Sequence, residues 1–352
     1  MNTKRTALNC KHTLSLGFLS VLTVGTVSCT FVQAGPGAYE SFADWCENQE
    51  TLTPEARHTV NLLLATADTQ DCDRADEILG NLTELDLTDS EISDVGPLSA
   101  LTQLIWLDLS FNQIETIEPL SILTNLETLH LQENQITNID PLSTLTQLTR
   151  LRLYGNSVNG VEPLSTLTHL KYLELADNKI ETIEPLSKLT ELEVLNLFGN
   201  QISDIEPLSS LNKLNELMLK NNQILDVEPL SGLTQLTKLN LDKNQIENVE
   251  SLSTLTHVTT LELNENQIED VEPLVVLPNL SYLALNDNQI TNVEPLSKLD
   301  NLEWLRLSRN QITDISALSM LTNLYALTLE GNPLPDSTCP VEPESTCTFQ
   351  DY

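Results

Sequence analysis

Positive charge is scarce in this chain of 352 residues, which has 17 lysine and arginine residues against 51 aspartate and glutamate residues. The formal net charge at pH 7 is −34. A field of this sign and size repels the phosphates of nucleic acid and the headgroups of anionic lipids at moderate salt. The composition therefore excludes nucleic acid and anionic membrane surfaces as partners.

Motifs of catalysis and of metal binding are also absent from the sequence. No serine or cysteine stands in a nucleophile elbow or a glycine-rich turn, and there is no phosphate-binding loop. The chain has no C-x-x-C pair and no calcium loop with its required glycine. We therefore expect a protein that is not an enzyme and that holds no metal ion or other cofactor.

The chain is rich in one feature, a repeat of 22 residues such as LTQLIWLDLSFNQIETIEPLSI (101–122). The repeat starts at Leu79, continues through eleven full turns without insertion or deletion, and ends in a truncated twelfth turn over 321–334. Within a turn, leucine fills positions 1, 7 and 9, asparagine usually position 12 and proline usually position 19. A coiled coil or amphipathic helix does not explain this pattern, because Leu-x-Leu has period 2 and the proline would break a helix in each turn.

The repeat predicts a solenoid of stacked turns. Leucines at positions 7 and 9 point inward from a short strand, so positions 6, 8 and 10 lie on the opposite, exposed face. The asparagine ends the strand and satisfies backbone groups in the turn, after which the chain returns along the outer side. Seven buried aliphatic side chains, at about 2–3 kcal/mol each, do not offset about 1.5 kcal/mol of ordering entropy per residue. A single turn is therefore unstable, and the turns must stack into a parallel sheet that lines a concave face.

The pattern L-x-x-L-x-x-L-x-L-x-x-N-x-I-x-x-I-x-P-L, which covers 79–334, resembles the 22-residue class of leucine-rich repeats. The best-known bacterial members of this class are the internalins, and a protein phosphatase regulatory subunit carries similar turns inside eukaryotic cells. The resemblance implies an α/β solenoid, a leucine-rich repeat horseshoe with a parallel concave β-sheet. It also implies a non-catalytic protein that binds a protein partner on that face.

The first 34 residues have the composition of a secretory signal peptide. Residues 1–12 carry three positive charges and no acid, residues 14–29 form an apolar run, and VQA (32–34) has the small-residue form of a signal peptidase site. A transmembrane anchor fits less well, because the run is short and contains two glycines. We expect a protein that is secreted or located in the cell envelope or periplasm. The alternative is cleavage before Cys29 and a lipoprotein anchored through this cysteine.

The four cysteines beyond this segment fall in two pairs at the ends of the chain, Cys46 with Cys72 and Cys339 with Cys347. Free thiols and a zinc site are the alternatives to disulfides. The two pairs flank opposite ends of a long solenoid, so one metal ion cannot collect all four. Two local disulfides in an oxidising compartment fit the pattern better.

Each pair is expected to close a cap, because an open solenoid has to cover its apolar ends. Residues 41–46 and 53–67 predict helices, the second with Thr53 as its N-cap and Pro54 in the first helical position. Prolines and a short cysteine-closed loop in 331–347 predict a cover for the last turn. The expected organisation is a signal peptide (1–34), a helical N-terminal cap (35–78), the repeats (79–334) and a short disulfide-closed C-terminal cap (335–352).

Basic and aromatic residues gather at the exposed positions of the strands. In the fourth turn Arg150, Arg152 and Tyr154 occupy positions 6, 8 and 10, and exposed tryptophan, tyrosine and arginine dominate the energy of protein interfaces. The alternative is that these side chains satisfy one another, with Arg152 paired to Glu174 and Arg150 lying over Tyr172. The predicted protein-binding residues of the concave face are Trp106, Phe111, His130, Arg150, Arg152, Tyr154, Tyr172, Phe198, Tyr282, Trp304, Arg306 and Arg309.

The leading hypothesis is a secreted, monomeric protein-binding module of the internalin-like type. One alternative is a glycan-binding or structural envelope protein that uses the exposed aromatic residues. Another is an intracellular regulatory scaffold resembling the phosphatase subunit, against which the signal peptide and the paired cysteines argue. Hydrolysis of a polysaccharide by concave carboxylates is not expected, because an open, wet sheet rarely gives the raised carboxyl pKa that a glycosidase needs.

Overall fold

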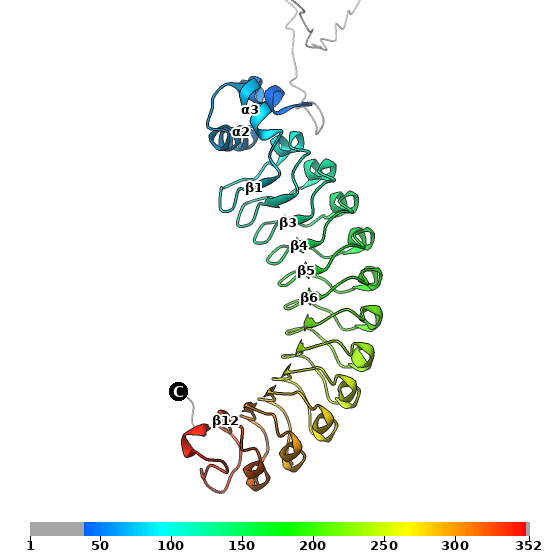
Figure 1. Ribbon diagram of the computed structural model, residues 1–352, viewed down its shortest axis with the longest axis vertical. Helices are drawn as coiled ribbons and strands as arrows, with labels where there is room; N and C mark the ends of the chain where they lie inside the picture. Colours follow the sequence, from blue (N-terminus) through cyan, green and yellow to red (C-terminus); the bar gives the residue numbers. More distant parts are fainter. Residues whose placement is uncertain (1–38, 350–352) are drawn as a thin grey trace, which may run out of the picture. The chain divides into compact units, whose positions relative to one another are not determined.

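The computed structural model describes residues 39–349 of the chain. The predicted signal peptide (1–34) and the alternative lipid site at Cys29 lie outside the described residues. Residues 39–349 contain thirteen parallel strands in one open sheet, and each strand pairs with the next strand along the chain. Figure 1 shows the strands on the inner side of a curved stack of turns and short helices on its outer side. These features confirm the predicted α/β solenoid with a parallel sheet on its concave side.

The strands of the repeats each have three residues and occupy positions 6 to 8 of successive turns. Paired strands set equal positions side by side, as Leu129, Leu151 and Leu173 show. Side chains at positions 6 and 8 therefore form columns that run across the exposed face of the sheet. The strands are β1 (Glu84–Asp86), β2 (Trp106–Asp108), β3 (Thr128–His130), β4 (Arg150–Arg152), β5 (Tyr172–Glu174), β6 (Val194–Asn196), β7 (Glu216–Met218), β8 (Lys238–Asn240), β9 (Thr260–Glu262), β10 (Tyr282–Ala284), β11 (Trp304–Arg306) and β12 (Ala326–Thr328).

Each full turn returns through a short 3₁₀-helix, an element that the repeat pattern does not predict. Proline stands in the first turn of most of these helices, where its missing N–H costs no hydrogen bond. The 3₁₀-helices are η2 (Gly96–Ala100), η3 (Glu118–Ile122), η4 (Asp140–Thr144), η5 (Glu162–Thr166), η6 (Glu184–Lys188), η7 (Glu206–Ser210), η8 (Glu228–Gly232), η9 (Glu250–Thr254), η10 (Glu272–Val276), η11 (Glu294–Lys298) and η12 (Ser316–Met320).

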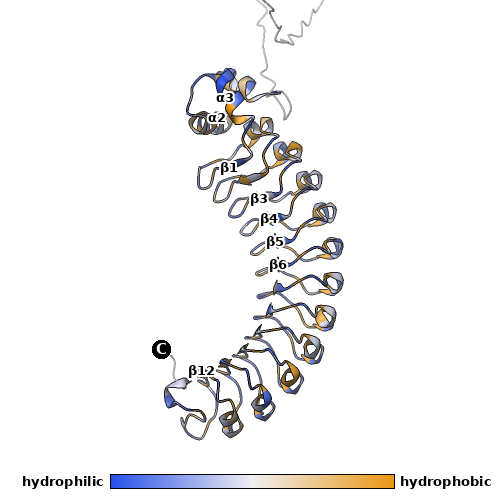
Figure 2. Cartoon of the chain, in the orientation of Figure 1, coloured by the Kyte–Doolittle hydropathy of each residue, from blue (hydrophilic) through white to orange (hydrophobic). Residues whose placement is uncertain are grey.

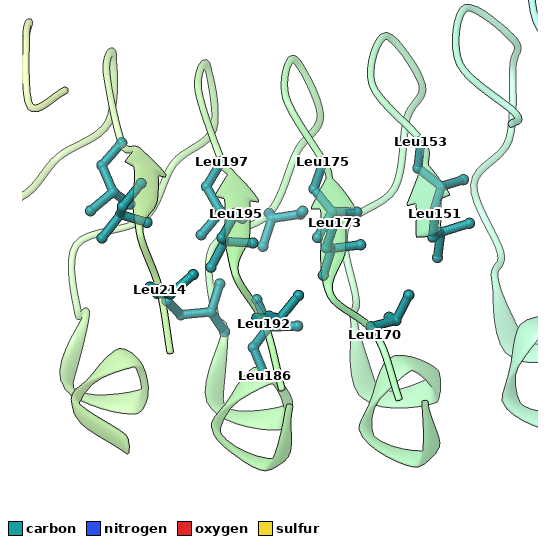
Figure 3. Close-up of a cluster of buried hydrophobic side chains, with 14 of the residues drawn as sticks. Leu151, Leu153, Leu170, Leu173, Leu175, Leu186, Leu192, Leu195, Leu197 and Leu214 are labelled. Carbon is teal, nitrogen blue, oxygen red and sulfur yellow. The ribbon is translucent and has the colours of Figure 1, made fainter. Parts of the chain in front are cut away.

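The core is a continuous column of aliphatic side chains between the strands and the outer helices. Figure 3 shows Leu151, Leu173 and Leu195 of three neighbouring turns, with Leu170 and Leu192 packed between the strands and the helices. All five are fully buried. Figure 2 shows that hydrophobic residues recur in the outer helices as well, so both sides of each turn contribute to the core.

The asparagine at position 12 links each turn to the one before it. The side-chain Nδ2 of Asn134 donates to the carbonyl of Leu131 in its own turn at 3.0 Å and to that of Leu109 in the preceding turn at 2.9 Å. Its Oδ1 accepts from the backbone N–H of Ile114, also in the preceding turn, at 3.0 Å. The same three bonds recur from Asn112 through Asn332. The sequence predicts that this amide satisfies backbone groups, and the structure shows that it also ties successive turns together.

The N-terminal cap consists of α1 (Phe42–Glu47), η1 (Gln49–Thr51), α2 (Pro54–Thr66) and α3 (Cys72–Leu79). The Thr53 side chain accepts from the N–H of Ala56 at 3.1 Å, and Pro54 opens α2, as expected from the sequence. The helix α3 was not predicted, and it ends on Leu79, which the repeat pattern places in the first turn. A disulfide joins Cys46 to Cys72, that is, α1 to α3, and we call it the N-terminal disulfide.

The C-terminal cap continues the sheet instead of only covering its edge. Its strand β13 (Cys347–Thr348) pairs in parallel with β12, and η13 (Glu344–Thr346) precedes it. A disulfide between Cys339 and Cys347, the C-terminal disulfide, closes the loop before this strand. The predicted disulfide-closed cap is therefore confirmed, and its added strand places Thr348 beside the last repeat.

Candidate binding face

The sheet register sets the predicted residues of the fourth turn beside those of the third and fifth turns. On β3, β4 and β5 the column at position 6 contains Thr128, Arg150 and Tyr172. Arg150 is exposed and Arg152 is half-buried, while Leu151 between them lies in the core. The alternation of the strand thus presents both arginines on the concave side, as the sequence predicts.

Two guanidinium groups converge on one aromatic ring. The Cζ atom of Arg150 lies 4.5 Å from the centre of the Tyr172 ring, and the Cζ atom of Arg152 lies 5.3 Å from the same centre. The Nε atom of Arg152 is 3.3 Å from Oε2 of Glu174, whereas Arg150 forms no ion pair with any residue of 39–349. We call Arg150, Arg152, Tyr154, Tyr172 and Glu174 the arginine–tyrosine cluster. Arg150 is thus the arginine of the cluster that has no carboxylate partner among residues 39–349.

Tyr154 supplies a hydroxyl group at the edge of the arginine–tyrosine cluster. Burial raises the pKa of Tyr154 above its ordinary value, and the charges of Glu133 and Glu174 raise it further, against the lowering effect of Arg152. The phenol therefore stays protonated at neutral pH and can donate a hydrogen bond.

The contacts that would satisfy this cluster from within are present. Arg152 pairs with Glu174, and Arg150 lies over Tyr172, as the alternative interpretation of the sequence requires. Exposed ion pairs contribute about 0–1 kcal/mol, and exposed cation–π contacts about 0.5–1 kcal/mol. These contacts hold the side chains in place without making them costly to redirect toward a partner.

His130 lies on the concave side but is largely buried there. Its Nδ1 is 2.9 Å from Oδ2 of Asp108, and its ring meets Trp106 edge to face with the ring centres 5.7 Å apart. Burial acts to raise the pKa of Asp108, but hydrogen bonds from Ser110 and His130 outweigh it and hold this pKa below its usual value. His130 therefore positions its neighbours more than it faces solvent.

A second group, the C-terminal cluster, consists of Tyr282, Trp304, Arg306, Arg309 and Tyr325. Tyr282 and Trp304 are register neighbours, and the Cζ atom of Arg306 lies 5.4 Å from the centre of the Tyr282 ring. Trp304 is 43% exposed and Tyr325 72% exposed. Arg309 forms a two-bond ion pair with Asp287, with Nε–Oδ1 and Nη2–Oδ2 distances of 2.5 and 2.7 Å.

Residues between the two clusters pair with one another. Lys238 lies 2.8 Å from Glu216, and Lys220 lies 3.5 Å from Asp242. Burial and the neighbouring Asp242 raise the pKa of Glu262, which lies beside these pairs. The concave face therefore has two clusters with exposed arginine and aromatic groups, separated by a strip whose charges are mutually neutralised.

The remaining predicted residues lie outside both clusters. Phe198 lies half-buried at position 10 of the sixth turn. Phe111 occupies position 11, where the backbone adopts a φ value of 57° in the turn after the strand. Phe111 is 48% exposed and lies beside the column of strand side chains. It makes no ring contact or ion pair with the arginine–tyrosine cluster.

The structure also shows hollows that sequence reasoning missed. A hollow of about 270 Å³ on the concave side adjoins Trp304 and Arg306 and is lined further by Asn286, Ser308, Arg309, Ala326, Thr328, Glu330 and Thr348. Small polar residues of this kind resemble ordinary surface in a sequence, and Thr348 comes from the cap. Another hollow, of about 960 Å³, lies on the outer side and is lined by carboxylates such as Glu247, Glu269 and Asp270. No group of three or more ligating side chains in residues 39–349 could hold a metal ion.

Comparisons with known proteins place this architecture in a family. The family described as leucine-rich repeats in two copies matches eight overlapping or adjoining segments between residues 80 and 298, and a further leucine-rich repeat family matches 278–334. The structure of an internalin, InlF of Listeria monocytogenes, is 32% identical, with 81% of this chain and 85% of that chain covered and a TM-score of 0.75. The chain belongs to the internalin-like leucine-rich repeat proteins. No curated protein matches it.

Structures of receptors share the solenoid. The leucine-rich repeat ectodomain of the Arabidopsis thaliana receptor kinase GASSHO1/SCHENGEN3, in complex with CASPARIAN STRIP INTEGRITY FACTOR 2, is 26% identical, with 72% of this chain and 36% of that chain covered and a TM-score of 0.61. A TDR receptor is also 26% identical, with coverages of 74% and 49% and a TM-score of 0.64. The leucine-rich repeat solenoid is typical of protein-binding modules, and the internalin-like family is generally non-enzymatic. Within residues 39–349, no helix has the length and apolar character needed to cross a bilayer.

Proposed function

We propose that this leucine-rich repeat protein is a non-catalytic protein-binding module that works outside the cell or in the cell envelope. The arginine–tyrosine cluster is the centre of its binding face. The observation that carries this proposal is the convergence of Arg150 and Arg152 on the ring of Tyr172, with a carboxylate partner for Arg152 alone. Arg150 is exposed, lies over the Tyr172 ring and has no ion pair with a residue of 39–349, so its guanidinium is available to an acidic group of a partner.

The energetics favour an exchange of contacts when a partner binds. The contact of the exposed Arg150 with Tyr172 is worth about 0.5–1 kcal/mol, whereas the half-buried pair of Arg152 with Glu174 holds its partners more firmly. A central arginine or tyrosine in a desolvated interface contributes about 2 kcal/mol or more. Redirecting the Arg150 guanidinium to a partner thus costs little and gains more.

Charge determines how the partner approaches. The rest of the protein is strongly negative, so a partner with a positive surface is steered toward it. Arg150, which has no ion pair with a residue of 39–349, then pairs with an acidic group of the partner at the point of contact. This arrangement fixes the orientation of the partner, because the opposite orientation would bring like charges together.

The compartment follows from the ends of the chain. Disulfides persist in oxidising environments, and the structure has one in each cap. Together with the expected signal peptide over 1–34, they support a secreted or envelope location, with a lipid on Cys29 as the alternative. We propose a monomer, with one partner molecule on the concave face.

The test is a comparison of partner capture by three forms of residues 35–352. The double variant Arg150→Glu, Arg152→Glu should still fold, because both side chains leave the sheet on the side away from the core. Arg152 is half-buried opposite Glu174, so the pair of like charges should cost about 1 kcal/mol, and circular dichroism checks that the variant keeps its fold. Its affinity for a partner captured by the wild type should fall several-fold to about a thousandfold, or ~1–4 kcal/mol. Quantitative mass spectrometry of the captured proteins and titration of the purified partner measure this loss.

The matched control is Glu181→Lys, a charge reversal of an exposed residue on the outer side of the fifth turn. This variant should capture the partner as the wild type does. Equal capture by the double variant and the wild type at low salt would place the binding centre elsewhere and contradict the proposal.

A further inference from the structure

The concave hollow at the C-terminal end is a site separate from the arginine–tyrosine cluster. It has a volume of about 270 Å³ and lies at the strands β10 to β13, whereas the cluster lies on β4 and β5. One of its walls, Thr348, belongs to the added strand β13 of the cap. The hollow and the arginine–tyrosine cluster share no residue, so binding of a ligand in the hollow does not require binding of a protein at the cluster.

Trp304 provides an uncovered aromatic surface beside this hollow. In the sheet it stands between Tyr282 on β10 and Ala326 on β12. Alanine is too small to cover the neighbouring indole, and Trp304 stays 43% exposed. An exposed indole face is a suitable surface for the C–H groups of a sugar ring, since such groups make weak but directional contacts with aromatic faces.

The hollow is lined by small polar groups that have free hydrogen-bonding capacity. The Oγ1 of Thr328 is buried and has no hydrogen-bond partner among residues 39–349. The hydroxyl groups of Ser308 and Thr348 and the Nδ2 of Asn286 likewise bond to no side chain or backbone group in that range, although the Oδ1 of Asn286 accepts from the N–H of Ser308 at 2.8 Å. Buried polar groups are ordinarily satisfied, so the unpaired Oγ1 of Thr328 in particular indicates a ligand with a hydroxyl group. The groups of Ser308, Thr348 and Asn286 are open to solvent and add further donors and acceptors for the same ligand.

Arg306 adds a positive group with open donors. Its guanidinium lies over Tyr282 and forms no ion pair with a described residue, although it acts electrostatically on Glu262. Arg309, by contrast, is already paired with Asp287 through two bonds. An arginine of this kind can bind a carboxylate through two parallel hydrogen bonds.

We propose that this hollow binds one terminal sugar residue that carries a carboxylate. Trp304 packs against the ring, the hydroxyl and amide groups bond the sugar hydroxyls, and Arg306 binds the carboxylate. A protein side chain fits less well, because the lining has three hydroxyl groups and only one aromatic wall. A polyanionic glycan is disfavoured, because the negative field of the protein repels a chain of charges but tolerates a single terminal one.

The test measures binding of free sugars to residues 35–352 by saturation-transfer NMR and calorimetry. The probes are N-acetylneuraminic acid and glucuronic acid, with N-acetylglucosamine and glucose as their neutral counterparts and a short glutamate peptide as a protein-like probe. The wild type should bind the acidic sugars more tightly than the neutral sugars and the peptide.

Three variants separate the parts of the site. Trp304→Ala should abolish binding of all the sugars, because it removes the ring surface. Arg306→Gln should weaken the acidic sugars about tenfold or more and leave the neutral sugars unchanged, since it removes only the charged contact. Thr328→Val keeps the shape of the side chain and should weaken every sugar without affecting the fold. Arg74→Gln, an exposed arginine on α3 of the N-terminal cap, is the matched control and should change none of these affinities.

Several results would overturn the proposal: no sugar bound by the wild type at millimolar concentration, equal binding by Trp304→Ala, or equal affinity for acidic and neutral sugars. Tighter binding of the glutamate peptide than of the acidic sugars would assign the hollow to a protein partner instead. Each of these outcomes leaves the capture experiment on the arginine–tyrosine cluster unaffected, so the two proposals fail separately.

Discussion

The asparagine ladder gives a prediction whose size follows from the contacts of one side chain. Asn200 is 7% exposed. Its Nδ2 donates to the carbonyls of Leu175 and Leu197 at 3.0 and 3.1 Å, and its Oδ1 accepts from the N–H of Ile180 at 3.0 Å. Asn200→Ala leaves three backbone groups without these partners. At about 1–3 kcal/mol for each buried group, and with water reaching some of them, we expect a loss of about 3–5 kcal/mol.

The loss should be local. Leu175 and Ile180 belong to the fifth turn and Asn200 to the sixth, and the stability of a stacked repeat array is a sum of turn and interface contributions. Hydrogen exchange followed by mass spectrometry should therefore show faster exchange in these two turns, while the N-terminal cap keeps its protection. Denaturant unfolding followed by circular dichroism gives the change in total free energy.

Asn196→Ala is the matched control for this prediction. Asn196 is the same residue type in the same turn, but it is half-buried on the concave face and its Oδ1 accepts a single bond, from the N–H of Phe198 at 3.1 Å. Its replacement should cost about 1 kcal/mol or less. If both variants lose the same stability, or if Asn200→Ala loses less than about 1 kcal/mol, the bonds between turns do not stabilise the stack and the reasoning is wrong.

Three further predictions concern the caps and the buried carboxyls. After reduction, hydrogen exchange should show that the helical cap loses its protection before the C-terminal cap does. The loop closed by the N-terminal disulfide spans 26 residues and that of the C-terminal disulfide spans 8. Loop entropy then gives a stabilisation of about 3.5 kcal/mol for the first disulfide and about 2.5 kcal/mol for the second. The raised pKa of Glu262 means that the folded state binds its proton more readily, so Glu262→Gln should raise the melting temperature at pH 7 and lose this advantage as the pH falls below its pKa. The lowered pKa of Asp108 has the opposite effect on stability. Ionised Asp108 stabilises the folded state above the unfolded pKa of about 4, and this stabilisation is lost as the pH falls further. Asp108→Asn should therefore destabilise the protein at pH 7 but not in acid.

The repeat pattern predicted the strands and their faces, and it failed where the chain leaves the pattern. Leucines at fixed spacing have one way to be buried, so the register of neighbouring turns could be derived from the period alone. The helix α3 was missed because half of its residues, CDRADEIL, are charged, and its burial depends on packing against α1. The strand β13 was missed because two residues have no periodicity, and they become a strand only through pairing with β12.

The sequence predicted the candidate site as columns of side chains on the sheet. The structure shows that side chains of the same column differ in burial. His130 and Arg152 occupy the same column and the same position in their turns, but His130 is buried against Asp108 and Trp106, whereas Arg152 keeps about one-third of its side chain exposed (32%). The repeat pattern does not predict this difference in burial, because both residues are polar and stand at the same position of their turns. The hollow at Trp304 was missed for a similar reason, since its polar wall includes Thr348, which lies outside the repeats.

The sequence by itself determined the solenoid, the direction in which each strand side chain points and the clustering of arginine and aromatic residues on one face. It could do so because a period of 22 residues without insertions places each side chain relative to its neighbours as soon as the leucines are buried. Only the tertiary structure decided which of these groups satisfy one another and which remain available. Those choices depend on distances between side chains of different turns, such as 3.3 Å from Arg152 to Glu174 and 4.5 Å from Arg150 to Tyr172, and no pattern within a single turn contains them.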